Sequence, residues 1–451
     1  MIRRLLVANR GEIARRVFAT CRVVGVETVA VFSDADATAP HVREADVALR
    51  LPGNAPAETY LRGDLIVDAA RRAGADAIHP GYGFLSENAD FAASVVDAGL
   101  VWVGPPPKAI AAMGSKLEAK ALLADEGVPI LPSWTEPDQV TGFPVLVKAS
   151  AGGGGRGMRI VRDRGELEVA IAAARREAAT AFGEDTVFCE RYVEPSRHVE
   201  VQVLADTHGT VVALGERECS IQRRYQKIVE ESPSPAVDEK LRAALCEAAV
   251  SAARAVGYVG AGTVEFLLTP EGPFYFLEMN TRLQVEHAVT ESVLGLDLVR
   301  LQLLVAEGRP LPFTQAPPML GHAIEVRLYA EDPGHGWRPS TGRVHRFSVP
   351  AHAEFAPLTT AGLRVDGGVE DGSDGKTQCR SPRTSSFQYS RAPGQFGNKS
   401  FTRAQSVPIG SRHGQSVSSS QAGWFGFTSV NSCGRIPLFS FIRDGRFMRP
   451  S

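Results

Sequence analysis

Residues 143–157 read Phe-Pro-Val-Leu-Val-Lys-Ala-Ser-Ala-Gly-Gly-Gly-Gly-Arg-Gly, an apolar run that ends in Lys148 and is followed by a cluster of glycines. Glycines let backbone N–H groups approach an anion without a Cβ in the way, and a lysine adds a point charge. The stretch does not match the G-x-x-x-x-G-K-[ST] pattern of a P-loop. It therefore predicts a different device for holding nucleotide phosphates.

The glycines also fit a second phosphate motif, G-x-G-x-x-G, at Gly152, Gly154 and Gly157. That motif is weak by itself, and a dinucleotide fingerprint should open a helix. Here the following residues, 158–161, read as a strand. We therefore expect a glycine-rich flap that joins two strands and folds over its ligand. An ordinary surface hairpin is the alternative.

Two glutamates form the next candidate site. The runs 260–269 and 273–280 are apolar and rich in aromatic residues, and Pro270-Glu271-Gly272 between them predicts a hairpin. If the turn centres on Glu271 and Gly272, Glu265 and Glu278 lie directly opposite each other. Opposed like charges destabilise a hairpin unless something neutralises them, and hard cations prefer carboxylate oxygens. The pair therefore predicts a divalent metal site.

Polar residues then alternate with apolar ones up to residue 286, which predicts that the strand continues with one polar face. That face carries Glu278, Asn280, Arg282, Gln284 and Glu286. An ordinary solvent-facing strand gives the same alternation. Because Glu265 and the flap are nearby, we favour a functional face.

The composition is that of a globular protein with an uneven charge distribution. The chain has 451 residues, 44% hydrophobic and 22% charged, with a net charge of −2. Residues 374–451 hold eleven Lys and Arg, two Asp and no Glu, a charge of +9 that leaves −11 for residues 1–373. The main body has no basic stripe of the kind that binds nucleic acid. Residues 374–451 are also rich in Ser and lack apolar periodicity, so we expect a disordered or aberrant tail.

Cysteine usage and hydropathy indicate a cytoplasmic protein. Six cysteines lie far apart with no C-x-x-C pair, so neither a zinc site nor a disulfide framework is predicted. No apolar stretch approaches the about 20 residues of a membrane span. The first ten residues lack the apolar region of a signal peptide. We expect no membrane partner.

Strands and helices alternate over the first hundred residues, which predicts a doubly wound α/β domain. Its strands are expected at 2–8, 27–32, 77–80 and 101–103, and its helices at 10–24, 60–73 and 88–98. The turn at Tyr82 follows a strand's carboxyl end, where such sheets bind ligands, although an ordinary turn fits equally well.

The rest of the chain predicts a lid and a second α+β part. Lys116 lies in the first turn of a helix, so it is either exposed or holds an anion. Strands at 187–193 and 198–204 are expected to complete the lid; a lone His198 on such a strand is more often structural. Arg327 lies in an apolar strand and would need an anionic partner. The expected domains are 1–113, 114–204, 205–373 and the tail 374–451.

Together these residues resemble the biotin carboxylase component of biotin-dependent carboxylases, an ATP-grasp family, nearest to the α-subunits of bacterial acyl-CoA carboxylases. The resemblance covers about residues 1–373 and is carried by the flap and by the stretches ANRGEIA at 8–14, HPGYGFLSEN at 79–88 and EMNTRLQVEH at 278–287. It implies an α/β fold with a doubly wound N-terminal domain, an ATP-grasp lid and a C-terminal α+β domain, the last incomplete.

The resemblance also implies a reaction: ATP-dependent carboxylation of carrier-bound biotin by bicarbonate via carboxyphosphate, within an acetyl-CoA or propionyl-CoA carboxylase. The implied cofactors are ATP, two Mg²⁺ or Mn²⁺ ions, and biotin on a separate carrier, because the chain has no Met-Lys-Met acceptor. The implied partners are bicarbonate, a biotin carboxyl carrier protein or domain, a carboxyltransferase subunit and a second copy of the chain.

The site residues that the resemblance implies fall into three groups. ATP would contact Lys116, Lys148, Gly154, Gly155, Glu190, Arg191, Tyr192, Val193 and His198. The metal ions would be held by Glu265, Glu278 and Asn280. Bicarbonate would meet Lys227, Arg282, Gln284, Val285 and Glu286, and biotin would meet Arg327 and Tyr82. Lys227, Arg282, Glu286 and Arg327 would be catalytic; Glu286 would deprotonate bicarbonate and Arg327 would stabilise the biotin anion.

Two departures from the family pattern keep other interpretations open. Tyr225 stands where many relatives carry His or Asn. After Ser373 the expected Tyr-Asp-x-Met-x-x-Lys strand is replaced by the Ser-rich tail, as a reading-frame shift would produce. The alternatives are an ATP-grasp ligase for a different acceptor and a truncated, non-catalytic nucleotide-binding relic.

Overall fold

The computed structural model describes residues 1–150, 158–223, 225–358 and 360–373. Beyond these it describes five short strands, Ser385–Arg391, Gly426–Thr428, Pro437–Phe439, Ile442–Arg443 and Arg446–Phe447. The centre of the glycine flap, with Gly154 and Gly155, lies outside the described residues.

The N-terminal part is a parallel five-stranded sheet in the order β3-β2-β1-β4-β5, which confirms the predicted doubly wound fold. Its strands are β1 (Arg4–Val7), β2 (Glu27–Phe32), β3 (Val47–Arg50), β4 (Ala77–His79) and β5 (Val101–Trp102). The helices are α1 (Gly11–Val24), α2 (Pro40–Glu44), α3 (Gly63–Ala73), α4 (Ala89–Asp97) and α5 (Pro107–Gly114). Strand β3 was not predicted, because its alternating half-buried pattern marks a sheet edge rather than a buried run.

The lid is a four-stranded sheet in the order β6-β9-β7-β8. It contains β6 (Ser133–Trp134), β7 (Val145–Ala149), β8 (Arg159–Val161) and β9 (Val187–Arg191), with helix α7 (Leu167–Phe182) packed against it. Helix α6 (Lys116–Asp125) precedes it. Strands β7 and β8 pair antiparallel, so the prediction that the flap joins two strands, and does not open a helix, is confirmed.

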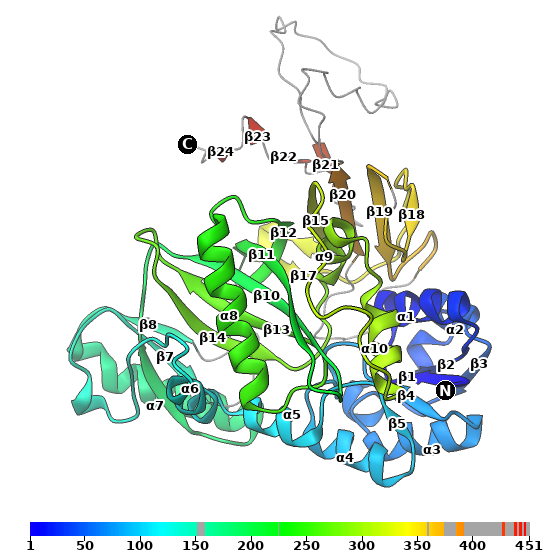
Figure 1. Ribbon diagram of the computed structural model, residues 1–451, viewed down its shortest axis with the longest axis horizontal. Helices are drawn as coiled ribbons and strands as arrows, with labels where there is room; N and C mark the ends of the chain where they lie inside the picture. The colour runs from blue at the N-terminus through cyan, green and yellow to red at the C-terminus, as the bar shows by residue number, and fades with distance from the viewer. Residues whose placement is uncertain are drawn as a thin grey trace, which may run out of the picture.

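The central sheet has nine strands in the order β14-β13-β10-β11-β12-β15-β20-β19-β18 (Figure 1). They are β10 (Arg197–Ala205), β11 (Val211–Arg223), β12 (Gln226–Ser232), β13 (Gly260–Leu268), β14 (Phe274–Asn280), β15 (His322–Leu328), β18 (Ala353–Glu354), β19 (Gly362–Gly367) and β20 (Ser385–Arg391). Strands β16 (Glu331–Asp332) and β17 (Arg338–Pro339) form a separate small hairpin.

Strand β10 corrects the predicted lid. Residues 198–204 were expected in the lid, but β10 pairs with β11 and β13 in the central sheet. Its strict alternation explains this: Val199, Val201 and Val203 are fully buried and pack with helix α8 (Glu239–Ala255) on one side. Glu200 and Gln202 face the other side, where Arg217 joins them to helix α9 (His287–Leu294). A strand buried on both faces belongs in the middle of a sheet.

Strand β20 differs from the expected structureless tail, most of which lies outside the described residues. Its backbone pairs antiparallel with β15 on one side and β19 on the other. The sequence Ser-Ser-Phe-Gln-Tyr-Ser-Arg alternates aromatic and polar residues at period two, a strand signal that the overall composition of the tail had hidden. The other tail strands form two isolated hairpins, β21 with β22 and β23 with β24.

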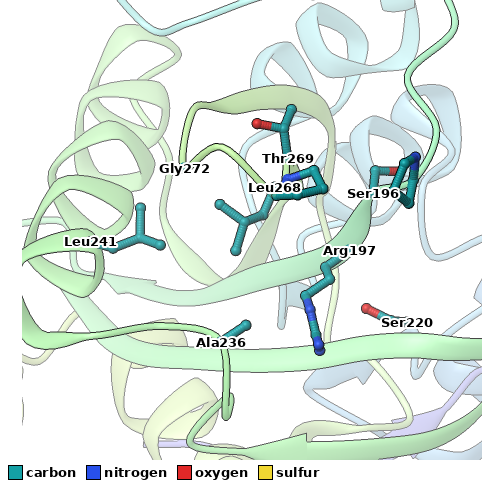
Figure 2. Close-up of a pocket in the computed structure, with 10 residues that line it drawn as sticks. Ser196, Arg197, Ser220, Ala236, Leu241, Leu268, Thr269 and Gly272 are labelled. Carbon is teal, nitrogen blue, oxygen red and sulfur yellow. The ribbon is translucent and has the colours of Figure 1, made fainter.

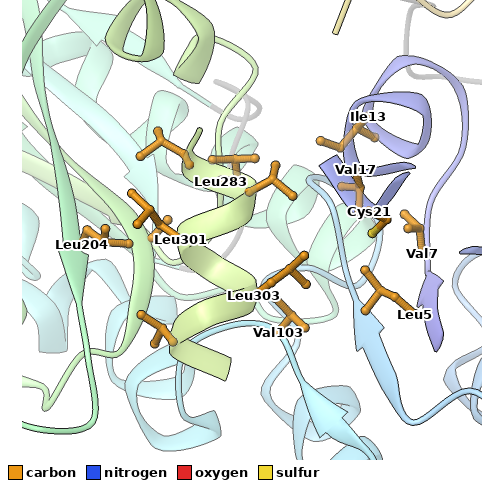
Figure 3. Close-up of a cluster of buried hydrophobic side chains, with 14 of the residues drawn as sticks. Leu5, Val7, Ile13, Val17, Cys21, Val103, Leu204, Leu283, Leu301 and Leu303 are labelled. Carbon is orange, nitrogen blue, oxygen red and sulfur yellow. The ribbon is translucent and has the colours of Figure 1, made fainter. Parts of the chain in front are cut away.

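One apolar core joins the N-terminal sheet to the central sheet. Figure 3 shows Leu303 of helix α10 (Leu298–Ala306) on the side toward Leu5, Val17 and Cys21 of the N-terminal part, and Leu301 on the other side of the helix, toward the central sheet. These side chains are at most 6% exposed. Burying so much apolar surface between the two sheets fixes their relative position, and with it the turn after β4 and the edge of the central sheet. No described helix is long and apolar enough to cross a membrane.

Candidate active site

The predicted carboxylate pair is present. Glu265 on β13 and Glu278 on β14 lie directly opposite each other in the antiparallel ladder. Glu265 is buried, whereas the side chain of Glu278 is 35% exposed and lies 3.5 Å from the ammonium of Lys116. Lys116 follows the N-cap Ser115 of α6, so its position in the first helical turn is confirmed, and it contacts an anionic group.

The strand does not continue to residue 286 as predicted. Strand β14 ends at Asn280, because the next residues turn toward the N-terminal part of the chain. The backbone N–H of Thr281 donates to Glu87 Oε1 at 3.2 Å, and Arg282 Nε donates to Glu87 Oε2 at 2.8 Å. These hydrogen bonds to Glu87, in the turn region after β4, therefore direct the chain away from the ladder after Asn280.

The polar residues still converge on Glu265. Asn280 Nδ2 and Gln284 Nε2 donate to Glu265 Oε1 at 2.8 and 3.0 Å. His198 Nε2 lies 2.9 Å from Glu265 Oε2. Arg282 Nη2 donates to Asn280 Oδ1 at 3.0 Å. The expected neighbours are thus brought together by a loop rather than by an extended strand.

Lys227 lies at the centre of the cluster. Its ammonium contacts Glu200 Oε2 at 2.5 Å, Glu265 Oε1 at 2.8 Å and Glu286 Oε1 at 2.6 Å. Burial alone would lower the pKa of Lys227, but the glutamates, led by Glu200, raise it well above its usual value. Lys227 is therefore a permanent cation that keeps three carboxylates together.

Arg327 is the second cation paired with Glu286. This confirms the prediction that Arg327 has an anionic partner. Its Nη2 donates to Glu286 Oε2 at 2.9 Å, and its Nε donates to Glu230 Oε1 at 2.5 Å. Both oxygens of Glu286 thus face cations. Burial raises the pKa of Glu286, but Lys227, Arg327 and Arg217 outweigh it and hold that pKa far below the usual range. The pKa of Glu265 is likewise lowered, against burial, mainly by Lys227 and His198.

Several residues of this cluster, notably Glu200 and Arg217, were not predicted as site residues from the sequence. Arg217 is fully buried and donates to Glu200 at 2.6 Å, to Thr290 at 2.9 Å and to Gln284 Oε1 at 3.0 Å. The signal for Arg217 was the charged triplet Glu216-Arg217-Glu218 shortly after the apolar run 211–214 of the same strand. The signal for Glu200 was its position beside His198 on one face of β10.

Three charged side chains of the lid side form a second buried group. Glu190 on β9 pairs with both Lys148 of β7 and Lys120 of α6. Burial lowers the pKa of Lys120 to about 7 and that of Lys148 to about 8. Glu278 opposes this lowering of the Lys148 pKa, whereas Lys116 lowers it further. Two lysines on one buried carboxylate leave an excess positive charge, which suits an anionic ligand.

The other expected nucleotide and biotin contacts lie nearby. Tyr192 and the exposed Arg191 line a cavity of about 330 Å³ together with Trp134 and Phe143, and Val193 follows them on the chain. Val285 O accepts from His287 Nδ1 at 3.1 Å if that nitrogen carries the proton.

Tyr82 donates to Glu12 at 2.8 Å, and burial together with Glu12 holds the pKa of Tyr82 well above its usual value. Arg327 and Glu325 also act electrostatically on Tyr82, which places this turn next to the Arg327 end of the site.

The residues at Glu265 fit a divalent cation. Two carboxylates and the Asn280 amide oxygen are hard donors of the type that Mg²⁺ and Mn²⁺ prefer. Ligand atoms of His198, Glu200 and Glu265 also lie within 4.8 Å of one another. The exposed side of Glu278 opens toward Lys116, so a cation there could reach a nucleotide phosphate held by the lysines.

A cavity of about 590 Å³ lies elsewhere, near the start of α8. Figure 2 shows Arg197, Ser220, Leu241 and Leu268 around it. Arg197 points away from the face of β10 that carries its neighbour His198, and it is paired with Glu218 at 2.5 Å. This cavity is separate from the Lys227 cluster.

Comparisons with known proteins match this architecture. Residues 1–110 match the model of the biotin carboxylase N-terminal domain, and residues 121–314 match that of the carbamoyl-phosphate synthase L chain ATP-binding domain. Biotin carboxylase of Halalkalibacterium halodurans is 50% identical over 361 residues, which are 78% of this chain and 80% of that protein. The chain belongs to the biotin carboxylase family.

Other relatives of this family are longer proteins, of which this chain matches about half. The mitochondrial methylcrotonoyl-CoA carboxylase α subunit of Oryza sativa subsp. japonica is 50% identical over 82% of this chain, which spans about half (51%) of that protein. The solved biotin carboxylase domain dimer of Hydrogenobacter thermophilus 2-oxoglutarate carboxylase, in complex with MgADP, ADP and bicarbonate, has a TM-score of 0.81. It is 41% identical, and the match covers 87% of each chain. The expected family and fold class are therefore confirmed.

Proposed function

We propose that this chain carboxylates carrier-bound biotin with bicarbonate and ATP, through carboxyphosphate, as the biotin carboxylase part of an acyl-CoA carboxylase. The observation that carries the proposal is the pairing of both Glu286 oxygens, one with Lys227 and one with Arg327. A carboxylate poised between two cations is a base placed where a small anion will bind. Bicarbonate fits because it is itself an anion that must lose a proton before it can attack.

The cations explain how a carboxylate of low pKa acts as a base. Without substrate, Lys227 and Arg327 stabilise the charged form of Glu286. When bicarbonate binds, its oxygens compete for Lys227, Arg327 and Arg282, so Glu286 loses part of that stabilisation and its pKa rises. Glu286 then takes the bicarbonate proton, and a bicarbonate oxygen attacks the γ-phosphorus of ATP with ADP as the leaving group.

Lys116, Lys148 and the flap would hold the ATP phosphates, with His198 and residues 190–193 on the ribose and adenine side. Divalent ions held by Glu265, Glu278 and Asn280 would neutralise charge on the phosphates during transfer. Lys116 lies 3.5 Å from Glu278 and so marks the point where phosphate and metal ligands meet. Gln284 donates to Glu265 and accepts from Arg217, which keeps this carboxylate in place.

Arg327 and Tyr82 would serve the acceptor. Once biotin loses its ureido proton, its oxygen carries negative charge, and Arg327 is a buried cation that can stabilise it. The carrier that brings biotin, the carboxyltransferase partner and a homodimer like that of the solved Hydrogenobacter thermophilus domain are part of this proposal. Four free cysteines among the described residues support a reducing, cytoplasmic location.

The experiment is to measure ADP release with bicarbonate and biotin added singly and together. We expect release only when bicarbonate is present, and a further increase with biotin. Release stimulated by a different carboxylic acid would indicate a ligase for another acceptor. ATP binding without any acceptor-dependent release would indicate a non-catalytic nucleotide-binding protein.

A further inference from the structure

A second carboxylate pair lies behind Arg327. Glu325 on β15 is fully buried, and neither of its oxygens has a hydrogen-bond partner within the described part of the chain. An ionised carboxylate in that position would be strongly unfavourable, because no side chain or backbone group that the structure describes donates to it. Glu325 must therefore carry a proton, and its O–H then needs an acceptor.

Glu230 supplies that acceptor. It lies directly opposite Glu325 in the ladder between β12 and β15. Its Oε1 holds Arg327, while its Oε2 is buried without a partner among the residues described. Cβ atoms of directly opposed residues are about 4.5–5.5 Å apart, so side-chain rotation can bring the Glu325 O–H onto Glu230 Oε2. One shared proton satisfies Glu230 Oε2 and one of the two oxygens of Glu325.

The surrounding charges favour this arrangement. Burial raises the pKa of Glu325 well above its usual value, and Glu230, Glu286 and Asp366 raise it further against the opposing effect of Arg327. Burial also raises the pKa of Glu230 to about 7, but Arg327 and, more weakly, Lys227 oppose the rise there. Glu325 also acts on the nearby Tyr82, whose pKa it raises. The proton therefore belongs on Glu325, and the charge on Glu230, next to Arg327.

We propose that Glu325 and Glu230 share one proton, carried by Glu325, and that this pair positions Arg327 for the carboxyl acceptor. The statement that Arg327 is positioned for the carboxyl acceptor rests on the proposed function. With one proton, Glu230 offers Arg327 a single negative charge that balances the one on Glu286. If both carboxyls were ionised, they would draw Arg327 away from Glu286. If both were protonated, Arg327 would pair with Glu286 alone and block the base.

The pair predicts opposite results for two chemically identical substitutions. In Glu325→Gln the amide N–H replaces the O–H, so kcat and KM for biotin should stay within about twofold of wild type. In Glu230→Gln the anion that holds Arg327 is lost, so kcat/KM for biotin should fall about 10- to 100-fold. Activity should also decline at alkaline pH in the wild type, as the shared proton leaves, and this decline should be absent in Glu325→Gln. Equal losses in both variants, or an unchanged alkaline decline in Glu325→Gln, would overturn the proposal.

Thermal unfolding tests the shared proton without any activity. Because the pKa of Glu325 is higher in the folded protein, folding takes up a proton, and this group lowers stability as pH rises from its usual pKa toward the raised value. Glutamine removes that cost, so the Tm difference between Glu325→Gln and wild type should grow between about pH 5 and pH 9. Glu271→Gln, in the exposed turn after β13, is the control and should show a constant difference.

The two readouts separate the two proposals. If the wild type shows no biotin-dependent turnover, the proposed function fails, while a growing Tm difference still supports the shared proton. A Tm difference for Glu325→Gln that stays constant with pH would refute the pair even in an active enzyme.

Discussion

Replacing Lys227 by methionine removes a cation that contacts Glu200, Glu265 and Glu286 at 2.5–2.8 Å. Methionine has a similar length, so the cavity left behind is small and the effect is mainly electrostatic. Leaving buried carboxylates without their cation typically costs about 3–5 kcal/mol. Arg217, Arg327 and His198 still contact the three glutamates, so we expect the low end, about 3 kcal/mol, or roughly 3–4 °C in Tm for a chain of this length.

The pH dependence distinguishes this charge effect from a packing effect. The lowered pKa values of Glu265 and Glu286 mean that their ion pairs stabilise the wild type above the usual carboxyl pKa, and that this stability is lost as pH falls. Lys227 has a raised pKa, so it remains fully charged below its usual pKa, and its own contribution is constant from pH 5 to 9. Without Lys227 the carboxylates are protonated more easily, so the deficit of the variant should shrink below about pH 5.

Differential scanning calorimetry of wild type and Lys227→Met between pH 4 and pH 9 measures this difference directly. Lys240→Met, on the exposed side of α8, is the matched control and should change Tm little at any pH. A deficit of the same size at pH 4.5 and pH 8 would mean that Lys227 acts through packing. A deficit below about 1 kcal/mol would refute the charge reasoning, because a lost buried ion pair costs more than that.

Three further predictions follow from individual contacts. Glu278→Gln should reduce metal-dependent ATP cleavage at least about 1,000-fold, because it removes a metal ligand. The fold should be largely preserved, because the substitution also relieves the repulsion from Glu265. Full Mg²⁺-dependent turnover would contradict the metal assignment. Arg327→Ala should leave ATP affinity, measured by calorimetry, within about threefold but cut biotin carboxylation about 100-fold or more, and loss of ATP binding would show that the roles are wrongly assigned. Limited proteolysis should spare the strand Ser385–Arg391, because it pairs on both sides, whereas a limit fragment that ends near Ser373 would contradict that pairing.

Local sequence patterns predicted most of the fold because they depend on nearest neighbours along the chain. The run that ends in Lys148 and the hairpin at Glu271 were correct, as their strands and turns are specified within a few residues. The assignment of 198–204 to the lid was wrong, because the choice of sheet depends on which distant surface covers Val199 and Val201. Strand β20 was missed because the composition of the whole tail was weighed above its seven-residue alternation.

In the site, too, only the contacts between residues close together in the sequence could be predicted. Sequence reasoning placed Glu265 and Glu278 opposite each other, because a hairpin fixes its register. It extended the strand past Asn280, because the partner that ends it, Glu87, lies almost two hundred residues away. Arg217 was missed for the same reason: its contacts come from strands and a helix that meet only in the folded chain.

The most direct test of the central claim is the fate of the oxygens of bicarbonate labelled with ¹⁸O. If Glu286 activates bicarbonate to attack the γ-phosphorus of ATP, one bicarbonate oxygen becomes bonded to phosphorus. Mass spectrometry of the inorganic phosphate released during biotin carboxylation should then find one ¹⁸O per phosphate, with the other two in the carboxyl group of carboxybiotin. Phosphate without label, released in step with carboxybiotin, would mean that ATP is cleaved by water, and would contradict the account.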